Sequence, residues 1–571
     1  MKLSEALSIV GSVPADTPEF PVLLACGFTP LHLQSYLAAH LQQAVHNRRV
    51  QIATGLYGDL AGTLENLGEA GAHACAVVVE WADLDARLGY RKLGGWGQRV
   101  VASTLESAEA MLQRIEAAIR ALPRSFPVAL SLPSLPLPPG FHTTAWQASP
   151  AEVALEEAVA NFAKRISGRP SIRIVNRQRL DAVSAPQARY DLRSDIHTGF
   201  PYTLAHADAL GSALAALLQP PQPKKGLITD LDDTLWLGLV GEDGHESLTW
   251  EATTKGHLHG LFQQMLHALA DHGVLLAIAS KNGPGIAAKA LDRPDLLIPR
   301  EKIFPVEVHW EPKSESVARI LRVWNVDAAS VVFVDDSPME LEEVRAAHPG
   351  IECLLFPKAD YVQGLAFLER LRDLFGKAHL SEEDSLRQES IRQAPQLDTG
   401  ASADSFLQRA EAVVTMHYDP PASDARVVEL VNKTNQFNLN GIRYTEAEWQ
   451  EALRQPRSFC AAVSYRDKFG PLGKIAVIRG KEEGKRLAIG TWVMSCRAFS
   501  RRIEYQSLFQ IFRKFSPGEI VFEYRATGKN APIQAFLTQV LEQPPAPDIR
   551  LTFDQFEARR PKLYHKVVEN E

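Results

Sequence analysis

The chain of 571 residues has few cysteines and no long apolar run. Its five cysteines are scattered without a CxxC pair, which argues against a disulfide framework and against a zinc knuckle. No apolar run approaches the ~20 residues that span a bilayer, and the start "MKLSEALSIVGSVPADTPEF" lacks the apolar core of a signal peptide. We therefore expect a soluble, cytoplasmic protein.

The chain also lacks a strong charge of either sign. Its net charge of −7 gives no basic footprint for nucleic-acid binding, and its 45% hydrophobic and 23% charged residues are ordinary for a globular protein. At roughly 100–200 residues per domain, a chain of this length should hold about three or four domains.

Two stretches are typical of linkers. "LLQPPQPKKG" (217–226) combines three prolines with two lysines, and "ESIRQAPQLDTGASADS" (389–405) is small, polar and broken by proline and glycine. They predict three segments, at 1–218, 224–378 and 404–571. No repeat of fixed period is present.

Short apolar strands alternate with helical stretches in the first two segments. In the first, the strands are expected at 20–26, 74–81, 127–132 and 171–176, and "SPAEVALEEAVANFAKRI" (149–166) has the spacing and the Ser N-cap of a helix. The middle segment repeats this rhythm around "GLITD", 274–280 and 331–336. This alternation predicts α/β domains with parallel sheets. In the third segment strands at 474–480, 486–493 and 519–524 follow with less helix between them, which indicates an α+β domain.

Three carboxylates follow directly after one expected strand of the middle segment. In "GLITDLDDT", Asp230, Asp232 and Asp233 stand at the strand's carboxyl end, where open α/β sheets bind ligands. Because neighbouring like charges repel, a hard divalent cation with oxygen ligands is the natural candidate to offset them. Taken alone, the cluster is equally compatible with a solvated acidic turn.

The order of the following motifs favours a phosphate site. "LLAIASKN" ends a strand at Ser280, "WEPKSESV" places Lys313 ahead of a helical stretch, and "VVFVDDSP" ends a strand at Asp335 and Asp336. This order resembles the haloacid dehalogenase-like (HAD) phosphotransferases. A hydroxyl can hold a phosphoryl oxygen, and a lysine can neutralise the same group.

The residue types and this resemblance imply a role for each position. Asp230 would be the nucleophile that becomes an aspartyl phosphate, and Asp232 the general acid and base. Asp233 is expected outside the catalytic set. The implied ligands of Mg²⁺ are Asp230, Asp232 through its backbone carbonyl, and Asp335 or Asp336. The positions implied to bind substrate in this segment are Thr234, Lys281 and Asn282.

A longer pattern, "DLDDTLWLGLVGEDG" (230–244), resembles the FkbH-like glyceryl-carrier-protein synthases of polyketide assembly. Further stretches fit that family: "SKNG", "HWEPKSESV", "VFVDDSPMELEEVR", "LVNKTNQFNLNGIRYTEAEW", "GTWVMSCRAFSRRIE" and "YRATGKNAPIQAFL". The resemblance implies removal of phosphate from 1,3-bisphosphoglycerate and transfer of the glyceryl unit to the thiol of an acyl carrier protein. It also implies a GNAT-like acyltransferase fold for 404–571.

The expected acyl-carrying cysteine is absent from its usual place. Relatives often read C-S-K-N where this chain has Ala279 before Ser280, and alanine cannot replace a thiolate. Three alternatives stay open: Cys496 carries the acyl group, transfer to the carrier is direct, or glyceryl loading has been lost. Cys496 could equally be a small core residue.

The run "NKTNQFNLN" (432–440) is a second candidate site. The family resemblance favours a loop in which Lys433, Asn435 and Gln436 contact acyl or phosphate oxygens. Asn and Thr also cap turns, so a structural loop is the alternative. The cluster Arg497, Arg501 and Arg502 suits the acidic surface of a carrier protein, or is an ordinary solvated surface.

The first segment resembles an SGNH-hydrolase-like domain through its α/β rhythm and "YDLRSDIHTGFPYT" (190–203). Such an enzyme needs a serine nucleophile after its first strand, where this chain reads "CGFT" (26–29), and its acid–histidine pair would be Asp195 and His197. Without that serine, we expect a non-catalytic scaffold or carrier-docking domain.

Three functions therefore compete: phosphate removal coupled to acyl transfer, a stand-alone HAD phosphatase or phosphotransferase acting on a phosphorylated biosynthetic intermediate, and a non-catalytic docking protein. The intact set Asp230, Asp232, Ser280, Lys313 and Asp335 counts against the docking protein, and Ala279 favours the stand-alone phosphatase over coupled transfer.

Overall fold

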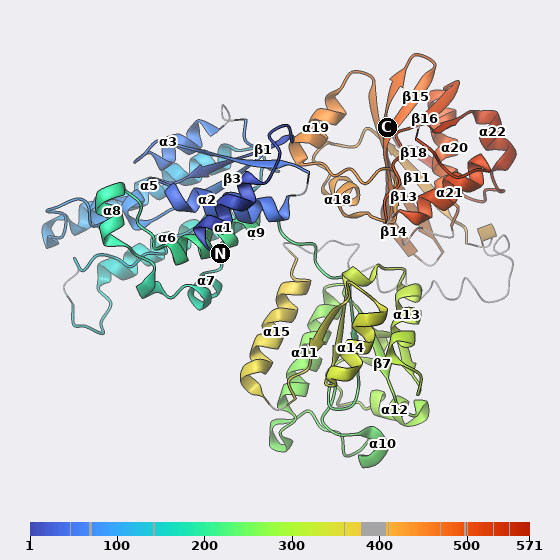
Figure 1. The fold of residues 1–571 in the computed structure, drawn as a ribbon, viewed down its shortest axis with the longest axis horizontal. Helices are drawn as coiled ribbons and strands as arrows, with labels where there is room; N and C mark the ends of the chain where they lie inside the picture. The colour runs from blue at the N-terminus through green and yellow to red at the C-terminus, as the bar shows by residue number, and fades with distance from the viewer. Residues whose placement is uncertain are drawn as a thin grey trace. The chain divides into compact units, whose positions relative to one another are not determined.

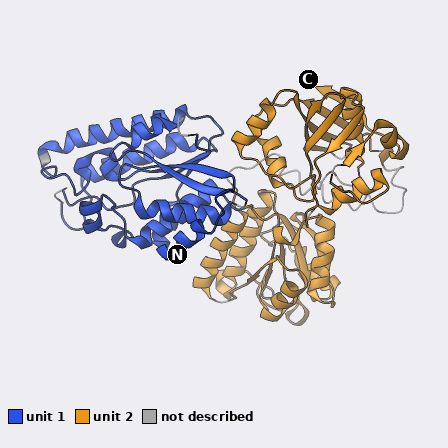
Figure 2. Cartoon of the chain, turned by 45° about the horizontal axis from the view of Figure 1, so that its top comes forward, with its two compact units in different colours: residues 1–221 blue, residues 222–571 orange. Residues whose placement is uncertain are grey.

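The computed structural model describes all residues except 46, 68–70, 141–142, 359, 378–406, 409, 469, 496–497, 499–500, 529, 548 and 571. The chain divides into two compact units, Met1–Pro221 and Gln222–Glu571 (Figure 2). The first unit ends inside the proline-rich stretch 217–226. The second contains two separate sheets.

The first unit is built on a five-stranded parallel sheet in the order β2-β1-β3-β4-β5. The strands are β1 (Glu19–Ala25), β2 (Arg49–Thr54), β3 (Ala74–Val78), β4 (Val128–Ser131) and β5 (Ile172–Ile174). Helices α1 (Leu3–Gly11), α2 (Leu31–Ala44) and α9 (Leu204–Leu218) pack on one face. Helices α3 (Leu60–Glu65), α5 (Val101–Ala121) and α6 (Pro150–Ser167) pack on the other. The shorter helices are α4 (Trp81–Leu84), α7 (Arg177–Val183) and α8 (Leu192–Thr198).

The second unit begins with another five-stranded parallel sheet, in the order β10-β9-β6-β7-β8. Figure 1 labels its strand β7 among the helices of this part of the chain. Its strands are β6 (Gly226–Thr229), β7 (Leu275–Ser280), β8 (Ile303–Val308), β9 (Val331–Asp335) and β10 (Glu352–Leu355). Helices α11 (His257–Asp271), α12 (Pro284–Leu291) and α15 (Tyr361–Phe375) cover one face. Helices α13 (Lys313–Trp324) and α14 (Pro338–Ala347) cover the other, and α10 (Val240–Asp243) is a single turn.

The rest of the second unit is an eight-stranded mixed sheet, so this part is α+β. Seven strands follow the order β17-β16-β15-β14-β13-β11-β18, and β12 pairs with β15. They are β11 (Val413–Tyr418), β12 (Phe437–Asn438), β13 (Ser458–Asp467), β14 (Gly470–Glu483), β15 (Arg486–Met494), β16 (Glu519–Phe522), β17 (Ile549–Leu551) and β18 (Lys566–Asn570). Helices α20 (Ile503–Phe515), α21 (Ala531–Leu541) and α22 (Phe553–Arg559) share the larger core cluster. Helices α18 (Ala425–Lys433) and α19 (Glu446–Arg454) pack on a second cluster.

The parallel α/β sheets are confirmed, and the strands that sequence reasoning missed lie mostly at sheet edges. β2, β8 and β10 are edge strands of the two parallel sheets. Each is only partly buried, with patterns that leave several residues half-exposed. An edge strand needs no continuous apolar run, because one side of it faces solvent, so its signal in the sequence is weak.

The core of the middle sheet leaves no room for a side chain at Gly226. A Cβ at this position would lie 2.4 Å from Cζ3 of Trp324, whose ring is buried and whose Nε1 donates a hydrogen bond to the Phe304 carbonyl at 2.8 Å. We predict that Gly226→Ala lowers the free energy of unfolding by about 1–3 kcal/mol, since the fixed ring cannot move aside.

Gly285 of α12 is the matched control, because a Cβ there meets no atom within 4 Å. Gly285→Ala should leave stability unchanged or raise it by up to ~1 kcal/mol through helix propensity. Urea unfolding of the wild type, Gly226→Ala and Gly285→Ala measures both changes in the free energy of unfolding. Equal stability of Gly226→Ala and the wild type would contradict this account of the β6–α13 packing.

Candidate active site

The predicted carboxylates lie where two central strands of the middle sheet end. β6 and β9 are neighbours, and the chain leaves β6 toward β7 on one side and β9 toward β10 on the other. Their carboxyl ends therefore form the crevice in which open α/β sheets bind ligands. Asp230 follows β6, Asp335 is the last residue of β9, and Asp336 comes next.

Asp230, Asp335 and Asp336 form a cluster that could hold a metal ion. Carboxylate oxygens of all three lie within 4.8 Å of one another. Asp230 and Asp335 are buried, and Asp336 is partly buried. Three carboxylates that converge in this way offer the hard oxygen donors that fit a divalent cation such as Mg²⁺.

Lys313 lies between two of these carboxylates. Its Nζ is 2.5 Å from Oδ2 of Asp335 and 3.1 Å from Oδ1 of Asp230, and its side chain is buried at the start of α13. Burial opposes the charge of Lys313, but Asp230 and Asp335 more than offset this and raise its pKa. Burial also raises the pKa of Asp230, with Lys313 opposing that rise and Asp335 adding to it.

The Asp232 carboxylate is held in a fixed orientation apart from the cluster of Asp230, Asp335 and Asp336. Its Oδ1 accepts hydrogen bonds from Trp236 Nε1 (2.9 Å) and from the Val240 amide (3.1 Å), and its Oδ2 accepts one from Asn282 Nδ2 (3.0 Å). The side chain is thus not a member of the cluster, so a metal contact of Asp232 would have to come from its backbone carbonyl.

Three more predicted residues lie in the same crevice. Asn282 Nδ2 also donates to Ser280 Oγ (3.2 Å), and both residues are buried. Thr234 is fully buried, and its hydroxyl donates to Asp336 Oδ1 at 3.4 Å. The structure therefore joins Ser280 and Asn282 to Asp232, and Thr234 to Asp336.

Lys281 is the exception among the predicted substrate-binding residues. Its Nζ donates to Glu340 Oε1 at 2.8 Å and lies 3.9 Å from Glu343, both on α14. Its ammonium is therefore engaged outside the carboxylate cluster. The family resemblance implied a place for Lys281 in the site, but neighbours in the chain leave a strand end in different directions.

Sequence reasoning missed Trp236, Lys358 and His259. The Lys358 ammonium lies 2.6 Å from Asp336 and 3.2 Å from Asp233, and the amide of Gly238 donates to the Asp233 carboxylate, which confines Asp233 to the rim. His259 of α11 contacts the Thr234 carbonyl through Nδ1 at 2.9 Å. Trp236 stands in the quoted motif and could have been found there, whereas Lys358 and His259 come from distant segments with no signal of their own.

The position of Ala279 changes what its identity means. Its side chain is fully buried in the apolar cluster that β6, β7 and β9 share with α13 and α14. The next residue, Ser280, faces the site. A cysteine at 279 would lie in this packed cluster, so alanine there does not by itself distinguish a stand-alone phosphatase from an acyl-transferring enzyme.

The asparagines of the run 432–440 have structural roles. Asn432 exchanges hydrogen bonds with the backbone of Tyr444, Asn438 accepts from the amides of residues 440 and 441, and Asn440 donates to the Gly490 and Glu523 carbonyls. These bonds fix the irregular segment that follows β12 and tie it to the end of α18, as the structural alternative predicts.

The three residues of that run that were predicted to contact a ligand differ in whether their polar groups already have partners. Lys433 is paired with Glu429 at 3.1 Å, and the Asn435 side-chain oxygen accepts from Arg443 at 2.5 Å. Gln436 Oε1, in contrast, is a buried acceptor without a hydrogen bond. Of the three, Gln436 alone has a buried polar atom without a hydrogen bond.

Of the predicted arginine cluster, the structure describes Arg501 and Arg502, and Arg501 does not lie at the surface. Arg501 is buried, lies 3.8 Å from the Asp467 carboxylate and stands over the Tyr465 ring. Arg502 donates to the Lys562 carbonyl at 2.8 Å. Arg497 and the candidate nucleophile Cys496 lie outside the described residues.

In the first unit, the stretch that follows β1 begins with the buried thiol of Cys26. Cys26 is buried, its Sγ donates to the Phe28 carbonyl at 3.3 Å, and burial raises its pKa to about 12. Asp195 is buried, whereas His197 on the same helix is exposed. These positions form no nucleophile–histidine–acid set, in agreement with the absence of the serine.

Comparison with known proteins shows the fold alone. The chain matches the N-terminal part of protein BF1531 from Bacteroides fragilis, a crystal structure containing a phosphatase domain complexed with Mg, at 20% identity and a TM-score of 0.52. The match covers 66% of this chain and 100% of that one, more than the segment 224–378 occupies. No family model and no curated protein matches the chain.

Two further solved structures resemble the chain only weakly. The salicylyl-acyltransferase SsfX3 of a tetracycline biosynthetic pathway matches at 13% identity and a TM-score of 0.21, covering 35% of this chain and 54% of that one. A GCN5-related glucosamine N-acetyltransferase region of a fungal β-N-acetylglucosaminidase matches at 10% identity and 0.15, covering 93% and 64%. Such scores are too low to indicate a shared fold. Among the described helices, none is both long and apolar enough to cross a bilayer.

Lys313 should be essential for the stability of the metal-free protein. Lys313→Met would leave Asp230 and Asp335 buried together without their cation, and breaking a buried ion pair in this way costs about 3–5 kcal/mol. We expect denaturant unfolding of the variant, in the presence of EDTA, to show a loss of that size.

Lys281→Met is the matched control, since it removes a partly exposed pair that contributes at most about 1 kcal/mol. Addition of Mg²⁺ should stabilise Lys313→Met, because a divalent cation can take over the compensation of the two carboxylates. A variant as stable as the wild type in EDTA would show that Asp230 and Asp335 do not depend on Lys313.

Proposed function

We propose that residues 224–378 catalyse Mg²⁺-dependent removal of a phosphoryl group through an aspartyl-phosphate intermediate on Asp230. The observation that carries the proposal is the convergence of Asp230, Asp335 and Asp336 within 4.8 Å, beside Lys313, at the carboxyl ends of β6 and β9. The BF1531 structure, which shares this fold and contains a phosphatase domain with Mg, supports it.

The residues divide the reaction into two displacements. An oxygen of Asp230 attacks phosphorus, the bond from phosphorus to the leaving oxygen breaks, and Asp232 as a carboxylic acid gives its proton to that oxygen. Water then attacks the aspartyl phosphate, and Asp232, now a carboxylate, takes the proton. Trp236, the Val240 amide and Asn282 keep Asp232 directed for both transfers.

The other residues bind and neutralise the phosphoryl group. Ser280 offers a hydroxyl and Lys313 a buried cation to its oxygens. Asp230, Asp335 and Asp336, with the Asp232 carbonyl, would hold Mg²⁺, which supplies positive charge that offsets the repulsion between nucleophile and phosphate.

We further infer the substrate and partner from the FkbH-like sequence pattern. The donor would be 1,3-bisphosphoglycerate, and the glyceryl unit would pass to the thiol of an acyl carrier protein, with residues 404–571 acting as a GNAT-like acyltransferase domain. Gln436 Oε1, buried and unsatisfied, is the best-placed polar atom of the 432–440 run to meet an acyl group.

A stand-alone phosphatase or phosphotransferase acting on a phosphorylated biosynthetic intermediate is the second candidate. One observation favours it: Lys433 and Asn435, expected to contact acyl or phosphate oxygens, are already engaged by Glu429 and Arg443. In this alternative the residues after 404 only shape the pocket of the phosphatase and carry out no chemistry.

Asp230→Asn tests the nucleophile. The change keeps the shape of the side chain but removes its negative charge, so release of phosphate from acetyl phosphate with Mg²⁺ present should fall by roughly a thousandfold or more. A colorimetric phosphate assay measures the rate.

Asp233→Asn is the control, because Asp233 contacts Lys358 and the Gly238 amide at the rim and should be dispensable for chemistry. Wild-type protein treated with EDTA should be inactive until Mg²⁺ is restored. If Asp230→Asn kept more than a few per cent of the rate, the nucleophile assignment would be wrong.

Cys496→Ala separates the two candidates. If Cys496 carries the acyl group, the variant should release phosphate from acetyl phosphate at the wild-type rate but leave an added carrier protein unloaded, because thioester exchange needs a sulfur. Intact-mass analysis of carrier and enzyme measures both.

Normal loading by Cys496→Ala would show that transfer is direct. A wild-type protein that loads no carrier with 1,3-bisphosphoglycerate or any other acyl phosphate would leave the stand-alone phosphatase as the function. Cys353→Ala, at a half-buried thiol of β10, is the matched control for loss of a cysteine.

A further inference from the structure

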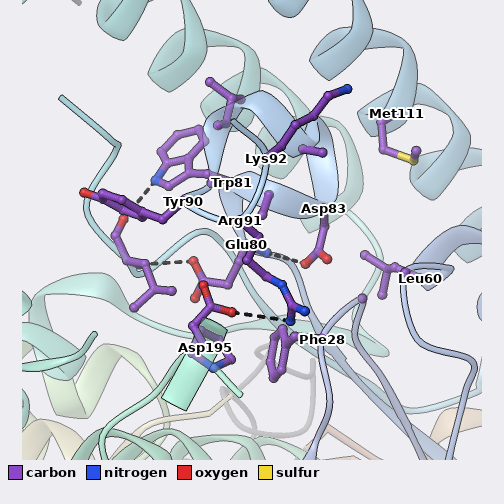
Figure 3. Close-up of a pocket in the computed structure, with 18 of the residues that line it drawn as sticks. Phe28, Leu60, Glu80, Trp81, Asp83, Tyr90, Arg91, Lys92, Met111 and Asp195 are labelled. Atoms are coloured by element: carbon purple, nitrogen blue, oxygen red, sulfur yellow. Dashed lines mark hydrogen bonds and ion pairs between the residues drawn. The ribbon is translucent and has the colours of Figure 1, made fainter. Parts of the chain in front are cut away.

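The first unit contains a cavity of about 350 Å³ at the carboxyl edge of its sheet (Figure 3). This lies within the roughly 300–1,000 Å³ typical of small-molecule pockets. Segments that follow β1, β2, β3 and β4 line it. In the strand order β2-β1-β3-β4-β5, the chain adds β2 on one side of β1 and the later strands on the other, so the cavity lies at the switch point between β1 and β3. Open α/β sheets bind their ligands at this point.

One part of the cavity is apolar. The side chains of Phe28, Leu60, Trp81, Leu88 and Met111 contribute to its lining, and Leu60, Trp81 and Leu88 are themselves buried in the core. Such a wall favours a ligand with an apolar group of its own, because burying that group removes apolar surface from water on both sides.

Three of the four carboxylates that line the cavity accept hydrogen bonds from backbone amides. Glu80 accepts hydrogen bonds from the Ser134 amide (3.0 Å) and hydroxyl (2.6 Å), the Leu135 amide (3.1 Å) and the Tyr202 hydroxyl (2.7 Å). Asp83 accepts from the Glu80 amide at 2.8 Å, and Asp59 caps α3 through the Gly62 amide at 2.9 Å.

The fourth carboxylate, Asp195, lies near Arg91, an arginine with few polar contacts. Its Oδ2 accepts from the Tyr190 hydroxyl at 2.7 Å, but its Oδ1 has only the Arg91 guanidinium, 3.9 Å away and beyond hydrogen-bond range (Figure 3). Within the described part of the chain, Arg91 has no hydrogen-bond acceptor and otherwise stands over the Tyr57 ring at 5.4 Å. Donor and acceptor thus lie side by side, each with capacity left for a ligand.

The nearness of Asp195 to Arg91 disfavours a purely anionic ligand. Burial raises the pKa of Glu80 and raises that of Asp83 to about 7, so these two carboxyl groups contribute little negative charge, and Arg114 is already paired with Glu65 outside the cavity. An anion at Arg91 would also lie close to Asp195. A purely cationic ligand at Asp195 would lie equally close to Arg91. A molecule carrying both charges on adjacent groups satisfies the pair without leaving either repelled.

We propose that this cavity binds a free α-amino acid with a large apolar side chain. The guanidinium fork of Arg91 takes the α-carboxylate, Asp195 takes the α-ammonium group, and the side chain lies against Leu60, Trp81 and Met111. The site belongs to the first unit alone and does not depend on the proposed phosphatase.

Titration calorimetry of the full-length protein with three probes tests the proposal. L-leucine should bind, whereas L-leucine methyl ester, which lacks the carboxylate charge, and N-acetyl-L-leucine, which lacks the ammonium group, should each bind roughly tenfold or more weakly. L-phenylalanine is a second apolar amino acid for the case that leucine is too small.

Two variants assign the charges to residues. Arg91→Met should weaken leucine binding to the level of the methyl ester and leave the ester unaffected. Asp195→Asn should weaken leucine binding to the level of N-acetyl-L-leucine and leave the binding of N-acetyl-L-leucine unaffected. Exposed residues of the first unit outside this cavity serve as controls in Arg177→Met and Asp16→Asn, which should bind as the wild type does.

The outcomes are separable. Because Arg91 is half-exposed, Arg91→Met should fold normally, which its thermal midpoint checks. The proposal is overturned if neither amino acid binds, if an ester or N-acetyl derivative binds as well as its parent, or if Arg91→Met binds leucine normally. Phosphate release should stay at the wild-type rate in all four variants, so a failure here leaves the phosphatase proposal unaffected.

Discussion

The repulsion between Asp230 and Asp335 is the constraint on which the middle part of the chain depends. Parallel pairing of β6 and β9 brings both carboxylates to one edge, and their burial makes the uncompensated charge costly. Lys313 supplies the compensation from the start of α13, with 2.5 and 3.1 Å contacts. The helix must therefore begin at this residue, and its apolar side, including Val317 and Ile320, fixes that start against the sheet.

The residues that follow β6 are organised by the same constraint. The chain turns at once after Asp230, with Asp233 in a left-handed conformation at φ 50°, and this turn directs Asp232 toward Trp236 and Asn282. Two carboxylates two residues apart thereby acquire different surroundings. Asp230 faces the buried ammonium group of Lys313 and the carboxylates of Asp335 and Asp336, while Asp232 is held by neutral donors at the edge. A nucleophile and a proton donor need such different environments.

The sequence allowed the sheets and most of the middle site to be predicted, because strand ends and motif order are local information. Asp230 and Asp335 stand at the ends of apolar runs that mark strands, and Lys313 follows a proline ahead of a helical stretch. The contacts of Lys358 and His259 could not be predicted, since they depend on how distant segments return to the edge. For Lys281 the family pattern implied a role in the site, whereas its ammonium group pairs with Glu340 and Glu343 of α14, a contact that depends on side-chain direction. The burial of Ala279 likewise depends on side-chain direction within a strand.

Lys358 has a consequence for how a cation would reach the cluster. It holds Asp336 at 2.6 Å and Asp233 at 3.2 Å from the segment after β10. A divalent ion that recruits Asp336 competes with this ammonium group, so the apparent affinity for the ion includes the free energy of displacing Lys358. Occupancy of the cluster and the position of the segment around Lys358 are then thermodynamically linked, and by reciprocity whatever draws Lys358 away favours the ion. A phosphorylated ligand, which can attract the released ammonium, would therefore bind cooperatively with the metal.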